Sequence, residues 1–166
     1  KVEEALKSGK VAARNLNNRQ RCVFLDRDGV INIDTDLIDR PEDLELYPYA
    51  ASSIRRLNKM GFLVVVVTNQ SVIARGLCTI ATLDEIHKKM ETELGQEGAF
   101  VEAIYFCPHH PHSGYEGEVK AYKVECSCRK PKPGMLLEAA DRFNIDLKQS
   151  YLVGDSPRDI EAGARA

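Results

Sequence analysis

Hydrophobic and polar positions alternate along most of this chain between short apolar runs and segments with helical spacing. The apolar runs are typical of strands buried on both faces and cover residues 22–26, 62–68, 101–106 and 150–155. Between them, apolar side chains recur every three or four positions, which predicts helices over residues 52–60, 82–94 and 133–143. Strands that alternate with helices in this way indicate an α/β fold with a parallel sheet and helices on both faces. The order of the strands stays open.

Residues with known end preferences mark the limits of the predicted helices. Gly61 and Gly95 are placed to end the first two, because glycine readily adopts the left-handed conformation that follows a helix. Thr82 with Glu85 forms the capping-box signature of a helix start, and Pro133 opens the third helix. These residues therefore predict the helix boundaries, in addition to the spacing of the apolar side chains.

The first part of the chain differs in character from the rest. Residues 1–20 are polar and end in an Asn/Arg/Gln stretch, which predicts a short helix and a linker before one domain at 21–166. A net charge of -2 gives no general attraction to nucleic acid or to an anionic membrane. The longest apolar run, at 62–67, is shorter than the roughly 18 residues of a membrane span, and no signal-peptide pattern opens the sequence. We therefore expect a cytoplasmic protein that binds neither nucleic acid nor membrane.

Polar side chains follow each of the predicted strands. They are Asp26, Asp28, Thr68, Asn69, the segment 107–112, Gly154 and Asp155. Ligands bind beyond the carboxyl ends of the strands in open parallel sheets, where all these ends meet. We expect a site at this edge.

The stretch FLDRDGVIN places Asp26 and Asp28 two positions apart. A single aspartate before a turn is usually a turn residue, but two carboxylates followed by Gly29 can approach one cation together. Asp155, from another strand end, offers a third carboxylate, and a ligand set made only of oxygen suits Mg²⁺. A carboxylate beside Mg²⁺ can attack phosphorus, so Asp26 is the predicted nucleophile and Asp28 the predicted general acid and base.

Phosphoryl transfer also needs hydrogen-bond donors and positive charge on the transferred group. Thr68 and Asn69 can donate from one side. The basic stretch RKPK offers Arg129, Lys130 or Lys132 from the other side, although such a stretch is by itself more often a solvated turn. The residues alone leave the choice among these cations open.

Several stretches, in this order, resemble the motifs of the haloacid dehalogenase superfamily of phosphohydrolases. They are DRDGV after the first strand, TNQ after the second, CRKPKPGM, and VGDSPRDIEAG. TNQSVIARG, CPHHP and CSCRKPKPGM extend the resemblance to the histidinol-phosphatase-like subfamily, and within it to phosphatases of sugar bisphosphates. The resemblance runs from about Cys22 to the last residue and implies a three-layer α/β/α Rossmann-like core.

The resemblance also implies a role for each matching position. Asp26 carries the phosphoryl group, and Asp28 is the acid and base. Mg²⁺ is held by Asp26, Asp155 and the backbone carbonyl of Asp28. Thr68 and Lys130 bind the transferred phosphoryl group.

Further positions are implied to bind the rest of the substrate. Arg129 contacts it directly, Asn69 supplies another donor, and Arg75 orients it. For Asp159 two interpretations stay open. It is an acid behind the site, or it lies in the first turn of a helix after Ser156, where an acid favours the positive helix end.

A second cluster of candidate ligands combines cysteines with a histidine. They are Cys107, His109, Cys126 and Cys128. Three thiolates and one imidazole make the closed tetrahedral set of a structural Zn²⁺ site, and the resembled relatives bind zinc with this pattern. His110 and His112 are then outside the ligand set. Zinc is expected to stiffen the loop at 107–128 and to hold the cations that follow it over the phosphate.

The spacing of the motifs restricts the shape of the site. The stretch between Asp26 and Thr68 has room for a strand end, a helix and a strand but not for a large cap domain, so an open site is expected. Two departures from the relatives fall nearby, since TDL at 35–37 replaces a Gly-Tyr pair and Val72 replaces a glycine. Few residues follow Asp159, so the C-terminus looks truncated and the last strand is expected near an unpaired edge.

The activity implied by the resemblance is Mg²⁺-dependent hydrolysis of the 7-phosphate of D-glycero-D-manno-heptose 1,7-bisphosphate through an aspartyl phosphate, in the biosynthesis of nucleotide-activated heptose for lipopolysaccharide. Hydrolysis of histidinol phosphate is the nearest alternative, because those enzymes share the motifs and the zinc pattern. A zinc-stabilised binding domain without catalysis is the alternative from another class. The polar segment 1–20 also suggests fusion to, or work with, a sugar-phosphate nucleotidyltransferase.

Overall fold

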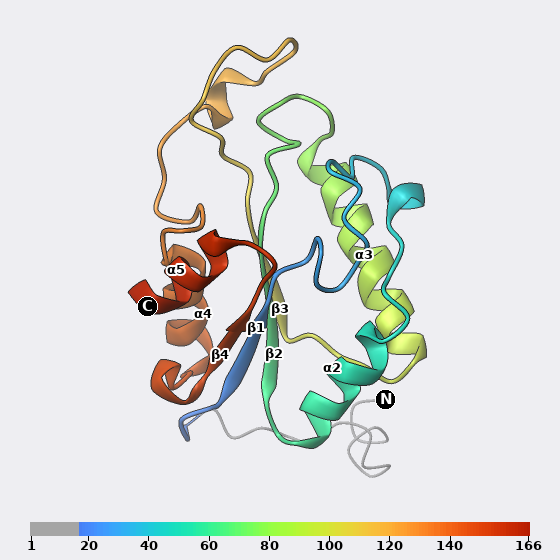
Figure 1. Cartoon of the computed structure of the whole chain (residues 1–166), viewed down its shortest axis with the longest axis vertical. Helices are drawn as coiled ribbons and strands as arrows, with labels where there is room; N and C mark the ends of the chain where they lie inside the picture. The colour runs from blue at the N-terminus through green and yellow to red at the C-terminus, as the bar shows by residue number, and fades with distance from the viewer. Residues whose placement is uncertain (1–16) are drawn as a thin grey trace.

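A computed structural model describes residues 17–166 of the chain. Its sheet consists of parallel strands in the order β3-β2-β1-β4 (Figure 1). The strands are β1 (Cys22–Leu25), β2 (Leu63–Asn69), β3 (Ala103–Cys107) and β4 (Tyr151–Val153). The predicted parallel α/β sheet is confirmed, and its strand order is now defined.

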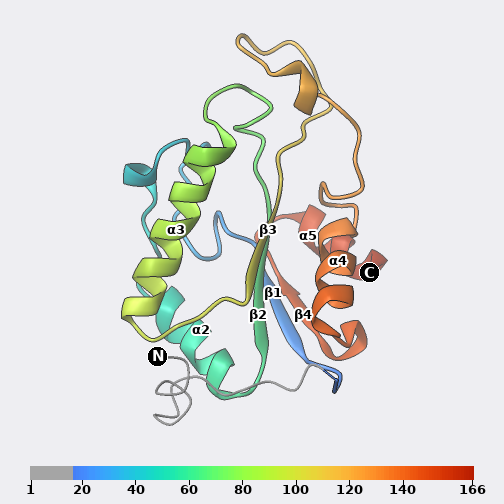
Figure 2. The same cartoon turned by 180° about the vertical axis from the view of Figure 1, so that it is seen from behind.

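Helices cover both faces of this sheet. On one face lie α2 (Ala50–Lys59) and α3 (Ile80–Gln96), and on the other lie α4 (Gly134–Phe143) and α5 (Pro157–Arg165) (Figures 1 and 2). Side chains of β2 alternate between the two apolar layers, with Val64 and Val66 in one and Val65 and Val67 in the other. The three-layer arrangement is therefore confirmed.

The start of α3 differs from the prediction. Thr79 is the N-cap residue, and its hydroxyl accepts a hydrogen bond from the backbone N–H of Thr82 at 3.1 Å. The predicted capping box from Thr82 to Glu85 is therefore wrong, because Thr82 already lies inside the helix. Gly95 also lies inside, since α3 continues past it.

The position of β1 in the sheet determines where a site forms. The chain proceeds from β1 outwards to β2 and β3, and it returns to the other side of β1 to form β4. Such a reversal of strand order opens a crevice at the carboxyl ends. Asp26 follows β1 and Asp155 follows β4, so both reach this crevice. Among the described residues β4 pairs only with β1, so it lies at one edge of the described sheet.

The segment between β1 and α2 forms no separate cap. Residues 27–49 run as a loop with the short 3₁₀-helix η1 (Pro41–Asp43), and Nζ of Lys89 in α3 donates to two backbone carbonyls of this loop. Within the described part of the chain, no helix has the length and apolar character needed to cross a membrane. The helix predicted near the N-terminus lies outside the described residues, and the association with a nucleotidyltransferase stays a prediction.

Candidate active site

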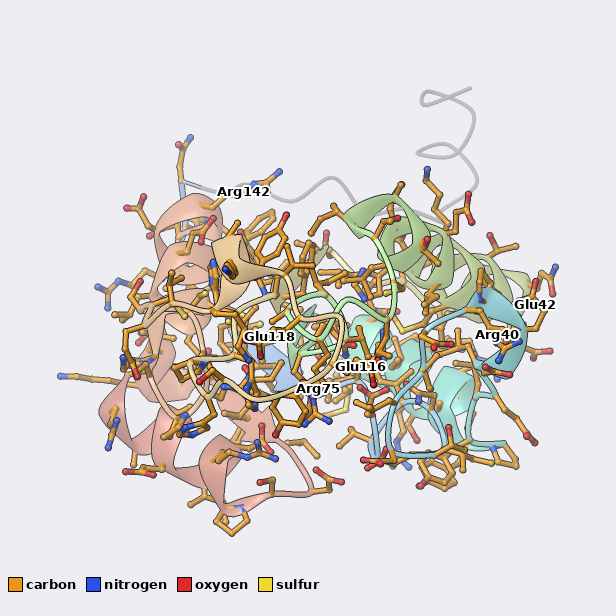
Figure 3. All side chains as sticks on the ribbon, turned by 90° about the horizontal axis from the view of Figure 1, so that it is seen from above. Arg40, Glu42, Arg75, Glu116, Glu118 and Arg142 are labelled. Carbon is orange, nitrogen blue, oxygen red and sulfur yellow. The ribbon has the colours of Figure 1, made fainter. Side chains whose placement is uncertain are left out.

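A cleft of about 270 Å³ opens at the carboxyl edge of the sheet. Its lining includes every residue predicted to react, to bind substrate or to hold Mg²⁺, namely Asp26, Asp28, Thr68, Asn69, Arg75, Arg129, Lys130 and Asp155. Figure 3 looks onto this end of the molecule, and in this view Arg75 lies near the middle while Arg40 and Arg142 appear towards opposite sides. These residues come from three strand ends and from loops, so the fold brings them together.

Asp26 follows β1 directly, and 14% of its side chain is exposed. Its Oδ2 lies 3.0 Å from Nζ of Lys130, and its Oδ1 accepts a hydrogen bond from the backbone N–H of Arg27 at 2.7 Å. Burial raises the pKa of Asp26 above its usual value of 3.8, and the positive charge of Lys130 opposes this shift. Lys130 therefore favours the ionised carboxylate that a nucleophile needs.

Several donors hold the carboxylate of Asp28. Arg27 donates from Nε to Oδ1 at 2.9 Å and from one terminal nitrogen to both oxygens at 2.8 and 3.0 Å. The side-chain amide of Asn32 donates to Oδ1 at 3.0 Å. Arg27 is 0% exposed, a rare place for a guanidinium unless it is paired. Sequence reasoning misses Arg27 and Asn32, because nothing in a polar turn indicates that these side chains fold back into the interior.

Carboxylate oxygens of Asp26, Asp155 and Asp159 lie within 4.8 Å of one another. Gly29 allows this approach, because a Cβ at its position would lie 2.1 Å from Oδ2 of Asp155, and its φ of 77° favours glycine. A set of oxygen donors suits Mg²⁺, so the residues present fit such a site. The carboxylate of Asp28 is not part of this set, and the contribution of its backbone carbonyl stays a prediction.

Asp159 fills both roles that the sequence left open. It completes a capping box at the start of α5, where its Oδ2 accepts a hydrogen bond from the backbone N–H of Ser156 at 3.2 Å. Its Oδ1 also accepts a hydrogen bond from Nζ of Lys130 at 2.5 Å. Lys130, which is 3% exposed, therefore bridges Asp26 and Asp159.

Thr68 and Asn69 end β2 on another side of the cleft. Asn69 donates from Nδ2 to the carbonyl of Lys130 at 3.1 Å and accepts from the N–H of Lys130 at 3.0 Å. This pair of bonds fixes the backbone of Lys130 against the sheet, in addition to any contact of Asn69 with substrate. Lys132 instead pairs with Glu125 on the surface at 2.7 Å, so Lys130 is the lysine that the fold places in the cleft.

The predicted zinc ligands converge beside the end of β3. Sγ of Cys126 lies 3.6 Å from Sγ of Cys107 and 3.4 Å from Sγ of Cys128. Nδ1 of His109 lies 3.7 Å from Sγ of Cys107 and 3.5 Å from Sγ of Cys128. Zn–S bonds of about 2.3 Å and Zn–N bonds of about 2.0 Å at tetrahedral angles require separations of roughly 3.5–3.8 Å. The geometry therefore fits a Zn²⁺ ion with four protein ligands.

The loop that carries these ligands, residues 107–128, also supports the arginines of the cleft. Arg129 donates to the carbonyl of His109 at 2.9 Å. The guanidinium of Arg75 lies over the ring of Tyr115, with 4.4 Å between Cζ and the ring centroid. The loop thus contacts both arginines.

The segments where the sequence departs from its relatives also line the cleft. Asp34 and Asp36 contribute to the lining, and Oδ1 of Asp34 accepts a hydrogen bond from the backbone N–H of Asp36 at 2.9 Å. Val72 lines the cleft and is 1% exposed. His110 lines it as well, and it lies outside the cluster of zinc ligands, as expected.

Comparison with known proteins gives a consistent result. The family model of haloacid dehalogenase-like hydrolases matches residues 9–166. The D-glycero-beta-D-manno-heptose-1,7-bisphosphate 7-phosphatase of Escherichia coli strain K12 is 43% identical over 144 residues, which are 87% of this chain and 73% of that protein. The protein of the same name from Rhodopseudomonas palustris is 41% identical over 148 residues, which are 89% and 80% of the two chains. The solved structure of a D,D-heptose 1,7-bisphosphate phosphatase from B. bronchiseptica, complexed with magnesium and phosphate, aligns with a TM-score of 0.77 and 42% identity over 88% of this chain and 76% of that one.

Proposed function

The chain belongs to the haloacid dehalogenase-like hydrolases, and on that premise we propose that it releases the 7-phosphate of D-glycero-D-manno-heptose 1,7-bisphosphate with Mg²⁺ and an aspartyl phosphate. The observation that carries the proposal is the convergence of Asp26, Lys130 and Asp155 in one cleft. These residues supply a nucleophile, a cation and an oxygen ligand. The relatives named for this activity, and the similar structure that holds magnesium and phosphate, support the substrate and the metal.

In the first half of the proposed reaction, Asp26 attacks phosphorus and forms a P–O bond while the bond to the sugar oxygen breaks. Asp28 donates its proton to that oxygen, so the sugar departs as an alcohol. Lys130 and the hydroxyl of Thr68 provide positive charge and a hydrogen-bond donor to the phosphoryl oxygens. Asp26, Asp155 and the backbone carbonyl of Asp28 would hold Mg²⁺, which would supply positive charge to the phosphoryl group.

In the second half, water attacks the phosphorus of the aspartyl phosphate. Asp28, now a carboxylate, takes a proton from this water, and the bond between phosphorus and Asp26 breaks. Phosphate then leaves, and Asp28 again carries the proton that it gave to the sugar oxygen in the first half. Cys107, His109, Cys126 and Cys128 would hold Zn²⁺ with no open position, so this metal would stiffen the loop 107–128 and supply no reacting group.

The rest of the cleft suits a second phosphate and hydroxyl groups. Arg75 and Arg129 line it, and a guanidinium binds phosphate oxygens in pairs. Asp34 and Asp36 can accept hydrogen bonds from sugar hydroxyls. One observation favours the alternative substrate, histidinol phosphate, because the same two carboxylates would also attract its amine cation.

Turnover of the two anomers of heptose 1,7-bisphosphate and of histidinol phosphate, each with Mg²⁺, tests the substrate. We expect the heptose to react faster, and faster turnover of histidinol phosphate would overturn that choice. Asp26→Asn tests the mechanism, because the amide cannot form the acyl phosphate that acid quenching traps. Full phosphatase activity in Asp26→Asn excludes the covalent route, and absence of turnover in the unmodified chain supports a binding domain instead.

A further inference from the structure

The motif TNQ contributes Thr68 and Asn69 to the proposed reaction but leaves Gln70 without a role. Gln70 is 2% exposed. Its Nε2 donates to Oγ1 of Thr68 at 2.8 Å and to Oδ2 of Asp28 at 2.8 Å. A single buried amide therefore contacts both a phosphate-binding hydroxyl and the acid/base.

The orientation of this amide is fixed by Arg27. Oε1 of Gln70 accepts a hydrogen bond at 3.1 Å from the terminal nitrogen of Arg27 that also contacts Asp28. A guanidinium only donates, so the amide must place its oxygen towards Arg27 and its nitrogen towards Asp28 and Thr68. Both groups thus depend on the position of Arg27.

Arg27 is in turn held by a residue of α3. Its other terminal nitrogen lies 3.4 Å from Nε2 of His87, which is 5% exposed. Burial, and next the charge of Arg27, lower the pKa of His87 to about 4. The ring is therefore neutral at neutral pH, and its Nε2 can accept the hydrogen bond from Arg27.

We propose that Gln70, Arg27 and His87 are positioning residues that aim the carboxyl group of Asp28 and the hydroxyl of Thr68 at the phosphate ester. Because Oγ1 of Thr68 accepts from Gln70, its own proton is free to point at a phosphoryl oxygen. The inference rests on the role of Asp28 in the proposed function. It extends that role to a helix residue that lines no part of the cleft.

Two substrates with different leaving groups separate this positioning role from a structural one. The sugar phosphate needs a proton on its departing oxygen, whereas p-nitrophenyl phosphate releases a stable phenolate and depends little on an acid. The ratio of the two kcat/KM values therefore reports how well Asp28 delivers its proton. A general loss of folded protein lowers both values equally and leaves the ratio unchanged.

We expect Gln70→Leu and His87→Leu to lower kcat/KM for the heptose bisphosphate by about 10–100-fold, the usual effect of losing a residue that orients a group of the site, and to lower it much less for p-nitrophenyl phosphate. His87→Gln keeps an acceptor for Arg27 and is expected to restore the ratio to near that of the unmodified chain. Met90→Ala is the matched control, because Met90 lies on the same helix, is 0% exposed and belongs to the apolar core. Gln70→Glu keeps the shape and the acceptor but loses the donor, so it gives the same readout where leucine prevents folding.

Asp28→Asn makes failure of the two proposals distinguishable. If Asp28→Asn slows the release of the sugar and of p-nitrophenolate equally in the first turnover, which does not include the water step, the acid role itself is wrong and the positioning role falls with it. If Asp28→Asn loses activity on the sugar phosphate selectively while the Gln70 and His87 variants do not, only the positioning role is overturned. The inference is supported if Asp28→Asn, the Gln70 variant and His87→Leu all lose activity on the sugar phosphate selectively, and if His87→Gln restores the ratio of the two kcat/KM values.

Discussion

Replacement of Lys130 by methionine removes a cation that two buried carboxylates share. Nζ of Lys130 lies 3.0 Å from Asp26 and 2.5 Å from Asp159, whose side chains are 14% and 2% exposed. Methionine has a similar length and no charge, so it fills the same space and leaves the carboxylates facing each other. The variant tests the electrostatics of the site with little change in packing.

The expected loss is large and depends on pH. Removal of one partner from a buried ion pair costs about 3–5 kcal/mol in free energy of unfolding. Burial already raises the pKa of Asp26, and loss of Lys130 raises it further. An acid whose pKa is higher in the folded than in the unfolded chain stabilises the folded state at pH values below its usual pKa of 3.8. This contribution to stability disappears as the pH rises through the raised pKa. The free energy of unfolding of the variant should therefore fall by the full amount of about 3–5 kcal/mol near neutral pH and by less in mild acid.

Urea unfolding followed by circular dichroism, at about pH 5 and about pH 8, measures this difference. Lys59→Met, at an exposed position of α2, is the control for loss of a lysine charge and is expected to change stability little. Phosphate release by Lys130→Met should fall by about 10²–10³-fold, the usual effect of removing one donor from a developing charge. An equal loss of stability at both pH values would refute the reasoning, since protonation of Asp26 would then relieve nothing.

Other predictions concern the metals and the substrate loop. Gly29→Ala should raise the Mg²⁺ concentration needed for half-maximal activity about tenfold by displacing an acid of that site, whereas Gly61→Ala, with a similar φ of 81° and open space around it, should not. Elemental analysis should find one zinc per chain. The zinc should be retained in Cys78→Ser, because Cys78 lies outside the cluster of candidate zinc ligands, and lost together with thermal stability in Cys126→Ser. Tyr115→Ala should raise KM about two- to fivefold at unchanged kcat, the equivalent of about 0.5–1 kcal/mol for an exposed cation–π contact. A large fall in kcat for Tyr115→Ala, or zinc retained in Cys126→Ser, would contradict these expectations.

The sequence predicted the sheet better than the helix ends, for a physical reason. A run such as LVVVVTN is buried on both faces, so every position in it carries the same apolar signal. The start of α3 depends on which of two threonines accepts the first hydrogen bond. Either Thr79 or Thr82 could be the N-cap residue by sequence. Thr79 is the N-cap because its backbone is extended, whereas Thr82 already lies in the helix.

The residues proposed to react could be predicted from the sequence, whereas the buried residues that contact Asp28 could not. Asp26 and Lys130 belong to the sequence motifs DRDGV and CRKPKPGM, whose acidic and basic side chains indicate phosphate chemistry. Gln70 contacts Asp28 because β1 and β2 pair in a register that opposes Leu25 to Val66, which brings their following turns together. No local pattern encodes such a register.

The charges at the candidate Mg²⁺ site argue for a divalent cation independently of any resemblance. The carboxylates that lie together there are those of Asp26, Asp155 and Asp159, and Lys130 is paired with two of them. Three carboxylates against this one cation leave a deficit of two positive charges, which a Mg²⁺ ion would supply. In Lys130→Met the deficit grows by one, so Mg²⁺ should raise the thermal unfolding temperature of this variant more than that of the unmodified chain. Equal shifts in the two proteins would mean that Lys130 and the metal do not act on the same carboxylates.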